Sequence, residues 1–373
     1  MAPAMVRLSE IVSVERLLDD VAAGFIAVRV HENGNARLLN YTAKAQYAGH
    51  WTKETLTCRG LIVSGAIEEP ETCVLARPFA KFANAYEHTT ESPFGELPVG
   101  RKFEVYEKLD GSLAIGYNLG DGLAFATRGS FVSEQAVAAT RLWRERYADV
   151  AVPGGVTVLF EYVAPWNRIV VGYEEEELIL LGGIDIATGA DVDLRDWAFP
   201  GRRAARYDGF SDFEEIARHM AENDTAMAEG FVVRFLPDTA SEASLRVKMK
   251  FAEYLRLHKV ASGVSTVSVF EHLSAGGTIE QMLELLPDEF HAFVREFGGE
   301  LQEKHQELVE KSRGIATSVA GLGRKEAAQV ATSQRDVPAG LVFGWLDGKD
   351  VAQLAWKTLR PDFEEASRAG ASV

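Results

Sequence analysis

The chain has 373 residues, of which 47% are hydrophobic and 10% aromatic, an ordinary composition for a globular protein and enough for two domains. The sequence lacks a run of about eighteen apolar residues and the apolar centre of a signal peptide, so we expect a cytoplasmic protein without a membrane partner. The net charge of −16 disfavours a uniformly basic surface. Two cysteines, Cys58 and Cys73, are too few for a disulfide framework and lack metal-site spacing.

The predicted elements change in kind along the chain. Residues 8–22 have the apolar spacing of a helix with Ser9 as its cap, and strand patterns dominate from about 25 to 260. Helices are expected near 133–148 and near 211–221, the second capped by Ser211. From about 264 the patterns are helical only, with amphipathic segments at 288–297, 300–311 and 351–359 that are separated by Gly276-Gly277, Gly298-Gly299 and Asp347-Gly348.

This change predicts two domains, a strand-rich domain at 1–262 and an all-helical domain at 263–373. The fold class is therefore α+β followed by an all-α domain. A strand-rich tail of the OB type is not expected after the first domain. Every candidate active-site residue precedes the change to helices, so we expect the chemistry in the first domain.

The segment Glu107-Lys108-Leu109-Asp110-Gly111-Ser112 lies between two strand-like runs, 103–106 and 113–117. A Lys-x-Asp-Gly turn in this position predicts a β-hairpin, in which Gly111 permits a positive φ and a close approach of the backbone to a ligand. Asp110 can hold the turn or a cation, and Ser112 adds a hydroxyl. Lys108 is a candidate nucleophile, although a lone lysine in such a turn is more often only a turn residue.

Further charged residues lie in the strands that follow. Glu161 is the single acid of the strand 156–163, and Glu229 precedes the strand 231–235. Lys248 and Lys250 are two residues apart in the strand 245–251 and therefore share a face. Three lysines and two carboxylates are a set of residues that nucleotidyl transfer could use. One lysine would attack an α-phosphate, two would neutralise phosphates, and the carboxylates would hold a ribose or a metal.

Any anion-binding groove must be local. Residues 1–260 carry 28 basic and 38 acidic side chains and residues 261–373 carry 11 and 17, so neither part is basic as a whole. We expect the groove to be lined by Arg59, Lys81, Arg128, Lys248 and Lys250. Phe79 and Phe82 are expected in the core rather than as stacking partners of a base.

Seven segments share the pattern of one family. They are Thr57-Cys58-Arg59-Gly60, the Arg-Pro-Phe-Ala-Lys-Phe-Ala-Asn run at 77–84, Lys-Leu-Asp-Gly-Ser at 108–112, Gly-Ser-Phe-Val-Ser-Glu-Gln-Ala at 129–136, the run 160–170 ending in Asn-Arg-Ile-Val, Glu-Gly-Phe-Val at 229–232, and Val-Lys-Met-Lys at 247–250 with Tyr254 and His258 beyond it. With them the chain resembles the covalent nucleotidyltransferases, and among these the tRNA-repair RNA ligase of T-even bacteriophages and its cellular relatives. Asn-Arg-Ile-Val at 167–170 is peculiar to this RNA-ligase branch.

The resemblance implies a ligase-type nucleotidyltransferase fold of antiparallel sheets with helices. Because no OB-like tail is expected, we expect the choice of substrate to lie with the all-helical domain, as an RNA-specificity module. The roles that it implies are lysyl-AMP formation for Lys108, phosphate contacts for Arg59, Lys81, Lys248 and Lys250, ribose binding for Glu161, metal placement for Glu229, nucleotide contacts for Tyr41 and Arg128, and a tyrosine needed for activity for Tyr254. Arg128 departs from the family, which often has lysine there, but it keeps the charge.

The implied activity is an ATP-dependent RNA ligase that joins a 3′-hydroxyl to a 5′-phosphate through lysyl-AMP and adenylated RNA, with Mg²⁺ or Mn²⁺. The implied partners are RNA ends, with nicked tRNA as one candidate, and the expected role is repair of tRNA or other RNA without an obligate protein partner. A DNA ligase or capping enzyme is the alternative within the fold, disfavoured by the missing OB-like tail and by Asn167-Arg168. A catalytically silent RNA-binding relative is the other alternative, disfavoured by the intact set of Lys108, Glu161, Glu229, Lys248 and Lys250.

Overall fold

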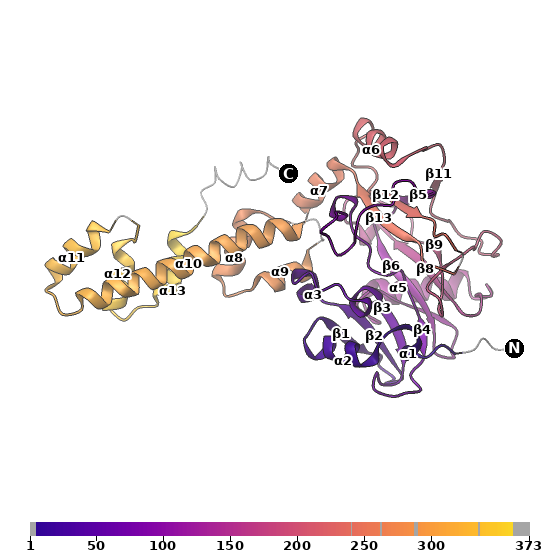
Figure 1. Cartoon of the computed structure of the whole chain (residues 1–373), viewed down its shortest axis with the longest axis horizontal. Coiled ribbons are helices and arrows are strands. Elements are labelled where there is room, and N and C mark those ends of the chain that lie inside the picture. The colour runs from indigo at the N-terminus through magenta and orange to yellow at the C-terminus, as the bar shows by residue number, and fades with distance from the viewer. Residues whose placement is uncertain (1–4, 240, 262, 287–289, 335, 361–373) are drawn as a thin grey trace. The chain divides into compact units, whose positions relative to one another are not determined.

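The computed structural model describes residues 5–239, 241–261, 263–286, 290–334 and 336–360. The chain divides into two compact units, Met1–Ala261 and Ser262–Val373 (Figure 1). Within the described ranges, no helix is both long and apolar enough to cross a membrane.

The first unit contains three antiparallel sheets. The first sheet has the order β1-β2-β3-β4, formed by Ile26–Val30, Ala36–Tyr41, Arg59–Ser64 and Val74–Ala76. The second has the order β10-β9-β8-β6-β7, formed by Asp191–Val192, Glu177–Asp185, Val156–Val163, Ser112–Asn118 and Leu123–Ala126. The third has the order β11-β5-β12-β13, formed by Arg206–Tyr207, Phe103–Lys108, Gly230–Phe235 and Leu245–Lys250.

Short helices accompany these sheets. They are α1 (Leu8–Ile11), α2 (Val14–Ala22), α3 (Ala43–Tyr47), α4 (Lys53–Thr57), α5 (Glu134–Arg146), α6 (Phe213–Glu222) and α7 (Ala252–Ala261), with 3₁₀ turns η1 (Ala85–Glu87) and η2 (Pro165–Asn167). The α+β class with antiparallel sheets is therefore confirmed for the first unit.

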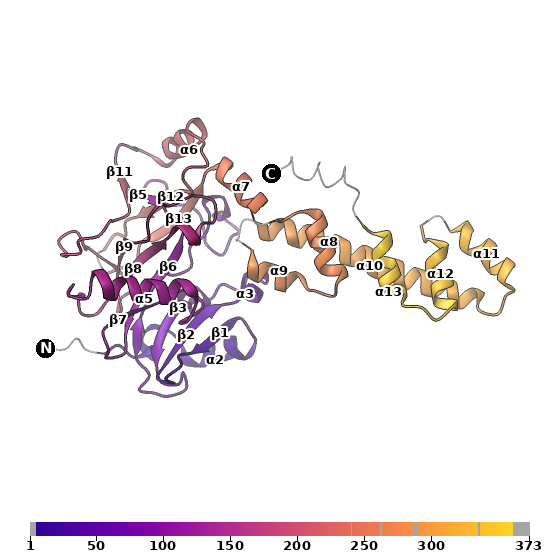
Figure 2. The same cartoon turned by 180° about the vertical axis from the view of Figure 1, so that it is seen from behind.

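The core of the first unit is built in layers. The first and second sheets pack face to face, with Leu38 and Ile62 against Ile115 and Leu159. Helix α5 covers the other face of the second sheet, where Trp143 packs among aromatic side chains (Figure 2). Helices α6 and α7 pack against the third sheet. Burial of these apolar faces holds the three sheets together. The charged strand residues lie between the sheets.

The second unit is all-helical in its described residues, as predicted. Its helices are α8 (Thr266–Ser274), α9 (Ile279–Leu285), α10 (His291–Val319), α11 (Arg324–Ser333), α12 (Ala339–Leu346) and α13 (Val351–Thr358). The long helix α10 contacts each of the other five, so it is the axis on which this unit is assembled.

The starts of two helices were predicted wrongly. The 8–22 segment forms two helices, because Val12 is extended and Ser13, not Ser9, accepts a hydrogen bond from the Arg16 amide at the start of α2. Helix α6 is capped by Asp212, which accepts from the Glu215 amide at 2.8 Å, and not by Ser211. The short Asp212 side chain reaches the Glu215 amide, which has no hydrogen-bond partner within the first turn of the helix, and Asp212 therefore caps α6.

The glycine pair 298–299 does not end a helix, since α10 runs through it. Gly298 is buried, and a Cβ atom there would lie 3.1 Å from the Ile279 side chain of α9. Glycine in a helix interior costs about 1 kcal/mol relative to alanine, and here it permits close packing of α9 on α10. The predicted start of the 288–297 segment lies outside the described residues.

Candidate active site

The Lys108 segment is not a hairpin turn, contrary to the sequence prediction. Strand β5 pairs with β11 and β12 in the third sheet, whereas β6 pairs with β7 and β8 in the second sheet. Residues 109–111 therefore cross from one sheet to the other. Gly111 does not have a positive φ, but a Cβ atom there would lie 2.4 Å from the carbonyl oxygen of Tyr162. Close approach to β8, rather than turn conformation, requires glycine at this position.

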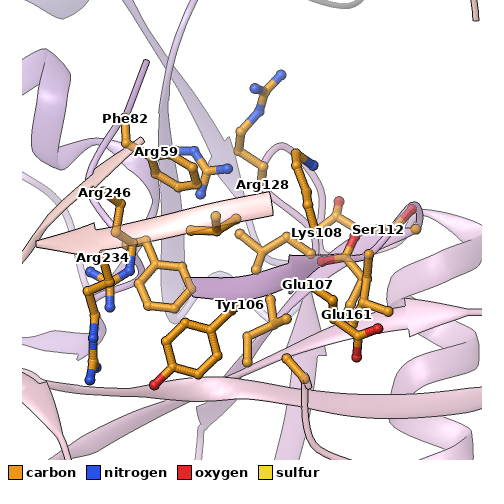
Figure 3. Close-up of a pocket in the computed structure, with 18 of the residues that line it drawn as sticks. Arg59, Phe82, Tyr106, Glu107, Lys108, Ser112, Arg128, Glu161, Arg234 and Arg246 are labelled. Carbon is orange, nitrogen blue, oxygen red and sulfur yellow. The ribbon is translucent and has the colours of Figure 1, made fainter. Parts of the chain in front are cut away.

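A cavity of about 550 Å³ lies at this crossing, with lining residues from all three sheets. Lys108, Ser112 and Glu161 lie toward one end, and Arg234 and Arg246 lie toward the other (Figure 3). The lining also includes Arg59, Phe79, Phe82, Tyr106, Glu107, Arg128, Gln135, Leu181, Ala204 and Val232. A nucleotide-sized ligand fits a concave site of this volume with few, well-placed polar groups.

Glu229 joins two of the predicted lysines. Its Oε1 atom lies 2.8 Å from the Lys108 Nζ and 2.8 Å from the Lys250 Nζ, and its side chain is only 5% exposed. Burial alone would raise the pKa of Glu229, but the two ammonium groups outweigh it and lower the pKa. Gly230 follows with a φ of +149°, and a Cβ atom there would lie 2.0 Å from the Met249 carbonyl oxygen, so glycine lets β12 lie close to β13 beside Glu229.

The pKa of Glu161, on β8, is displaced in the opposite direction from that of Glu229. Burial raises its pKa from the ordinary 4.5 to about 8, and the positive charges of Lys108 and Arg59 only partly oppose this effect. At neutral pH the side chain is therefore mostly protonated and can donate a hydrogen bond as well as accept one. Two carboxyl groups with displaced pKa values beside a lysine are typical of a reaction site.

Asp110 fixes the segment that follows Lys108. Its Oδ2 atom accepts hydrogen bonds from the amides of Val170 and Val171, each at 2.8 Å, and its Oδ1 atom accepts from the Tyr254 hydroxyl at 2.8 Å. Val170 ends the Asn-Arg-Ile-Val segment, and Val171 follows it. Asn167 of the same segment donates to the Ser112 hydroxyl at 3.2 Å. The Asn-Arg-Ile-Val segment and the residue after it thus hold both ends of the crossing from β5 to β6.

The predicted phosphate-binding cations lie near aromatic rings. The Lys81 Nζ lies 5.6 Å from the Tyr41 ring centroid, and Arg128 donates a hydrogen bond to the Tyr41 hydroxyl at 3.1 Å. Arg59 lies over the Phe82 ring at 5.2 Å, and the Lys248 Nζ lies over the same ring at 5.9 Å. Contact with a ring face stabilises each of these cations electrostatically.

The predicted site residues form one neighbourhood but differ in their access to the cavity. Lys108, Arg59, Arg128 and Glu161 line it directly. The others contact residues of the lining. Lys250 contacts Glu229, which contacts Lys108, and Lys81 contacts Tyr41, which contacts Arg128. Lys248 contacts Phe82, and Tyr254 contacts Asp110 of the crossing segment. Phe79 is buried, as expected, yet it also lines the cavity with Phe82.

Sequence reasoning missed two cavity arginines. The Arg246 side chain is 11% exposed, pairs with Asp191 of β10, and lies 4.2 Å from the Phe79 ring centroid. Arg234 pairs with Glu104 and lies 3.2 Å from the same Asp191 carboxylate. Although burial opposes ionisation of Asp191, the two arginines outweigh it and lower its pKa. The period of two in β13 could have revealed Arg246, because it shares a face with Lys248 and Lys250.

Comparisons with known proteins show similarity to RNA ligases. A family model described as RNA ligase matches residues 57–254, more than half of the chain. The chain is similar to a candidate RNA ligase of Thermovibrio ammonificans, with 30% identity over 50% of this chain and 49% of that protein. It is also similar to a candidate bifunctional polynucleotide kinase/RNA ligase of Autographa californica nuclear polyhedrosis virus, with 24% identity over 70% of this chain and 39% of that protein. The chain thus spans at most about half the length of these curated relatives.

Among solved structures, an archaeal ATP-dependent RNA ligase is 14% identical, with 90% of this chain and 96% of that chain covered and a TM-score of 0.43. A likeness at this TM-score adds nothing to the assignment, which rests on the family model. The matched residues 57–254 include Lys108 and every carboxyl and cation of the site described above, whereas Tyr41 lies before them. The chain belongs to the RNA ligase family.

Proposed function

We propose that this chain is an ATP-dependent RNA ligase that joins a 3′-hydroxyl to a 5′-phosphate through a lysyl-AMP intermediate. The observation that carries the proposal is the contact of Lys108 with Glu229, which also holds Lys250, at the wall of a nucleotide-sized cavity. Family membership supports the same reaction. The relatives are longer than the matched segments, so the substrates of the whole protein are part of the proposal.

In the first step the neutral Lys108 amine attacks the α-phosphorus of ATP. A P–N bond forms, the bond from that phosphorus to the bridging oxygen breaks, and pyrophosphate leaves. The Glu229 carboxylate lies 2.8 Å from the Lys108 Nζ, so it can orient the amine and accept its proton. Lys250, Lys248, Arg59, Lys81 and Arg128 are proposed to stabilise negative charge on the phosphates, while Tyr41 contacts the nucleotide and Glu161 binds a ribose hydroxyl.

In the next two steps the AMP passes on to RNA. An oxygen of the RNA 5′-phosphate attacks the lysyl-AMP phosphorus, which breaks the P–N bond and forms a pyrophosphate linkage. The 3′-hydroxyl of a second RNA end then attacks the 5′-phosphate, and AMP leaves as the phosphodiester forms. The proposed physiological role is repair of tRNA or other RNA.

A divalent cation, Mg²⁺ or Mn²⁺, is expected in this family but has no ready set of ligands in the described residues, which contain no group of three or more His, Cys, Asp or Glu side chains suited to a metal. Glu229, the predicted metal ligand, already faces two ammonium groups. All the contacts of Asp110 described above are made by hydrogen-bond donors. A cation here would depend mainly on substrate phosphates, as Mg²⁺ often does.

The all-helical unit is proposed to select the RNA rather than to supply chemistry. All residues proposed for nucleotide transfer lie in the first unit. A chain ending at residue 261 should therefore still form lysyl-AMP, while discriminating less well between a nicked stem-loop and a plain single strand. A soluble fragment with an unchanged substrate ratio would contradict this role.

The direct test of the activity is incubation with α-labelled ATP or GTP, with and without magnesium, followed by denaturing electrophoresis. Label from ATP that stays on the protein, and moves to RNA bearing a 5′-phosphate, is the expected result. Label from GTP alone would indicate capping-type chemistry instead.

A further inference from the structure

A row of four aromatic side chains begins beside the active-site cavity. Tyr41 and Trp51 meet edge to face with centroids 5.1 Å apart, Trp51 lies 5.8 Å from Phe94, and Phe94 lies 5.8 Å from His88. We call Tyr41, Trp51, Phe94 and His88 the aromatic row. Tyr41 is buried, whereas the other three are partly exposed.

Cations connect the aromatic row to the cavity. The Lys81 Nζ lies 5.4 Å from the Trp51 ring centroid and 5.6 Å from that of Tyr41. Arg128 lies 5.3 Å from the Tyr41 ring, is exposed, and also lines the cavity that holds Lys108. A ligand that leaves the cavity past Arg128 therefore meets positive charge first and rings next.

The segments that carry the row are held by backbone hydrogen bonds. The Lys81 amide donates to the Leu56 carbonyl at 2.8 Å, and the Lys248 amide donates to the Ala83 carbonyl at 3.0 Å. Further along, the His88 ring contacts the Gly95 carbonyl at 3.0 Å, and the Phe94 amide donates to the Ser92 hydroxyl at 3.0 Å. The rings are thus in place before a ligand arrives, which lowers the entropy cost of binding.

We propose that the aromatic row is a binding site for single-stranded RNA next to the reacting end, with bases stacked on Trp51 and Phe94 and a phosphate at Arg128. This inference rests on the proposed function. Stacking on aromatic rings is a principal way of holding single-stranded RNA, and it accepts any base because each base has a π-face. It also suits a chain of net charge −16, which cannot rely on a broad basic surface.

The choice of a single strand over a duplex follows from the same physics. Bases in a helix are already stacked on one another, so a protein ring can reach them only where the strand is unpaired. A 5′-phosphorylated single-stranded oligoadenylate should therefore bind better than a blunt duplex with the same end.

The test is fluorescence anisotropy with the labelled oligoadenylate on the full chain, run beside autoadenylation in the absence of RNA. Phe94→Leu keeps an apolar side chain of similar size but removes the ring, and it should raise the Kd for the oligonucleotide about 5- to 100-fold. Autoadenylation should stay within about twofold, because Phe94 contacts neither the cavity lining nor Lys81 in the contacts described here. Phe94→Tyr, which keeps the ring, should restore most of the affinity.

The matched control is Tyr207→Leu, which removes a 42% exposed ring on β11 that contacts Phe231 and is not a member of the aromatic row. It should change neither readout. Equal affinity of Phe94→Leu and the parent chain for the oligoadenylate would overturn the proposal, as would a loss in Tyr207→Leu of the same size. A Phe94→Leu chain that loses autoadenylation and RNA binding together would overturn it as well, since the ring would then support the nucleotide site. Failure of the parent chain to take label from ATP would instead count against the proposed function, because the binding measurement does not require catalysis.

Discussion

The Nζ atom of Lys108 and the Oε1 atom of Glu229 lie 2.8 Å apart, in a pair whose side chains are 19% and 5% exposed. Lys250 shares the same oxygen at the same distance. A single buried carboxylate therefore holds two ammonium groups side by side where an anionic phosphate is proposed to bind. Loss of that carboxylate removes the anion that two cations share in a poorly solvated site.

Glu229→Gln should lower the free energy of unfolding by about 3 kcal/mol or more, because removing one partner of a buried ion pair leaves uncompensated charge. Chemical denaturation measures this loss. The matched control is Glu71→Gln, which breaks the Arg7–Glu71 pair, with side chains 51% and 78% exposed. The control should cost less than about 1 kcal/mol. Equal losses of unfolding free energy in the two variants would show that the contacts of Glu229 with Lys108 and Lys250 do not stabilise the fold more than an exposed ion pair does.

Glu161 should make the folded state less stable as pH rises. Its pKa is about 8 in the folded chain and near 4.5 when unfolded, so between these values the folded chain holds a proton that the unfolded chain has released. The free energy of unfolding should then fall as pH increases from about 5 to 8, by at most about 1.4 kcal/mol per pH unit from this group. Glu161→Gln should remove this slope in pH-dependent denaturation, and an unchanged slope would contradict the raised pKa.

Tyr254→Phe removes the hydroxyl that donates to Asp110 at 2.8 Å and should slow lysyl-AMP formation about tenfold or more. The physical reason is positioning, because Asp110 orients the segment directly after Lys108. The unfolding free energy should fall by about 1.5–3 kcal/mol, the range for a hydrogen bond to a charged group. Single-turnover adenylation at saturating ATP separates the effect from ATP binding. A variant with the parental rate would place Tyr254 outside the reaction.

Gly111→Ala should unfold the chain or abolish adenylation, since its Cβ would lie 2.4 Å from the Tyr162 carbonyl oxygen and 2.9 Å from the Val163 side chain. Gly100→Ala is the matched control, because nothing lies within 4 Å of its added Cβ. Thermal unfolding of both variants decides the point. If Gly111→Ala melts at the parental temperature, the crossing between the two sheets is looser than described.

The sequence predicted those features of the site that follow from the alternation of side chains between the two faces of a strand. The strand Val156–Val163 was located with the correct bounds, and Lys248 and Lys250 do share a face of β13. The pairing of strands was not predictable in this way, because a short turn between two apolar runs has the same pattern whether the runs pair or enter different sheets. The wrong hairpin at Lys108 follows from this ambiguity.

Other features had no sequence signal. Trp51, His88 and Phe94 lie outside regular helices and strands, so no periodicity brings them together. The Asn-Arg-Ile-Val segment was singled out only by family resemblance, and its contacts with Ser112 and Asp110 depend on the tertiary fold. At Gly298 the sequence signal was misleading. The low helix propensity of glycine predicts the end of a helix there, but packing against α9 keeps α10 continuous.

The central claim is that Lys108 is the nucleophile, and transfer of label from α-labelled ATP to the denatured protein tests it most directly. The parent chain and Lys102→Ala, a control that removes an exposed lysine six residues earlier, should both become labelled. Lys108→Ala should take up no label, and yet it should still seal RNA that already carries AMP at its 5′ end, since that step needs no lysyl intermediate. Covalent label on the Lys108→Ala chain would contradict the claim.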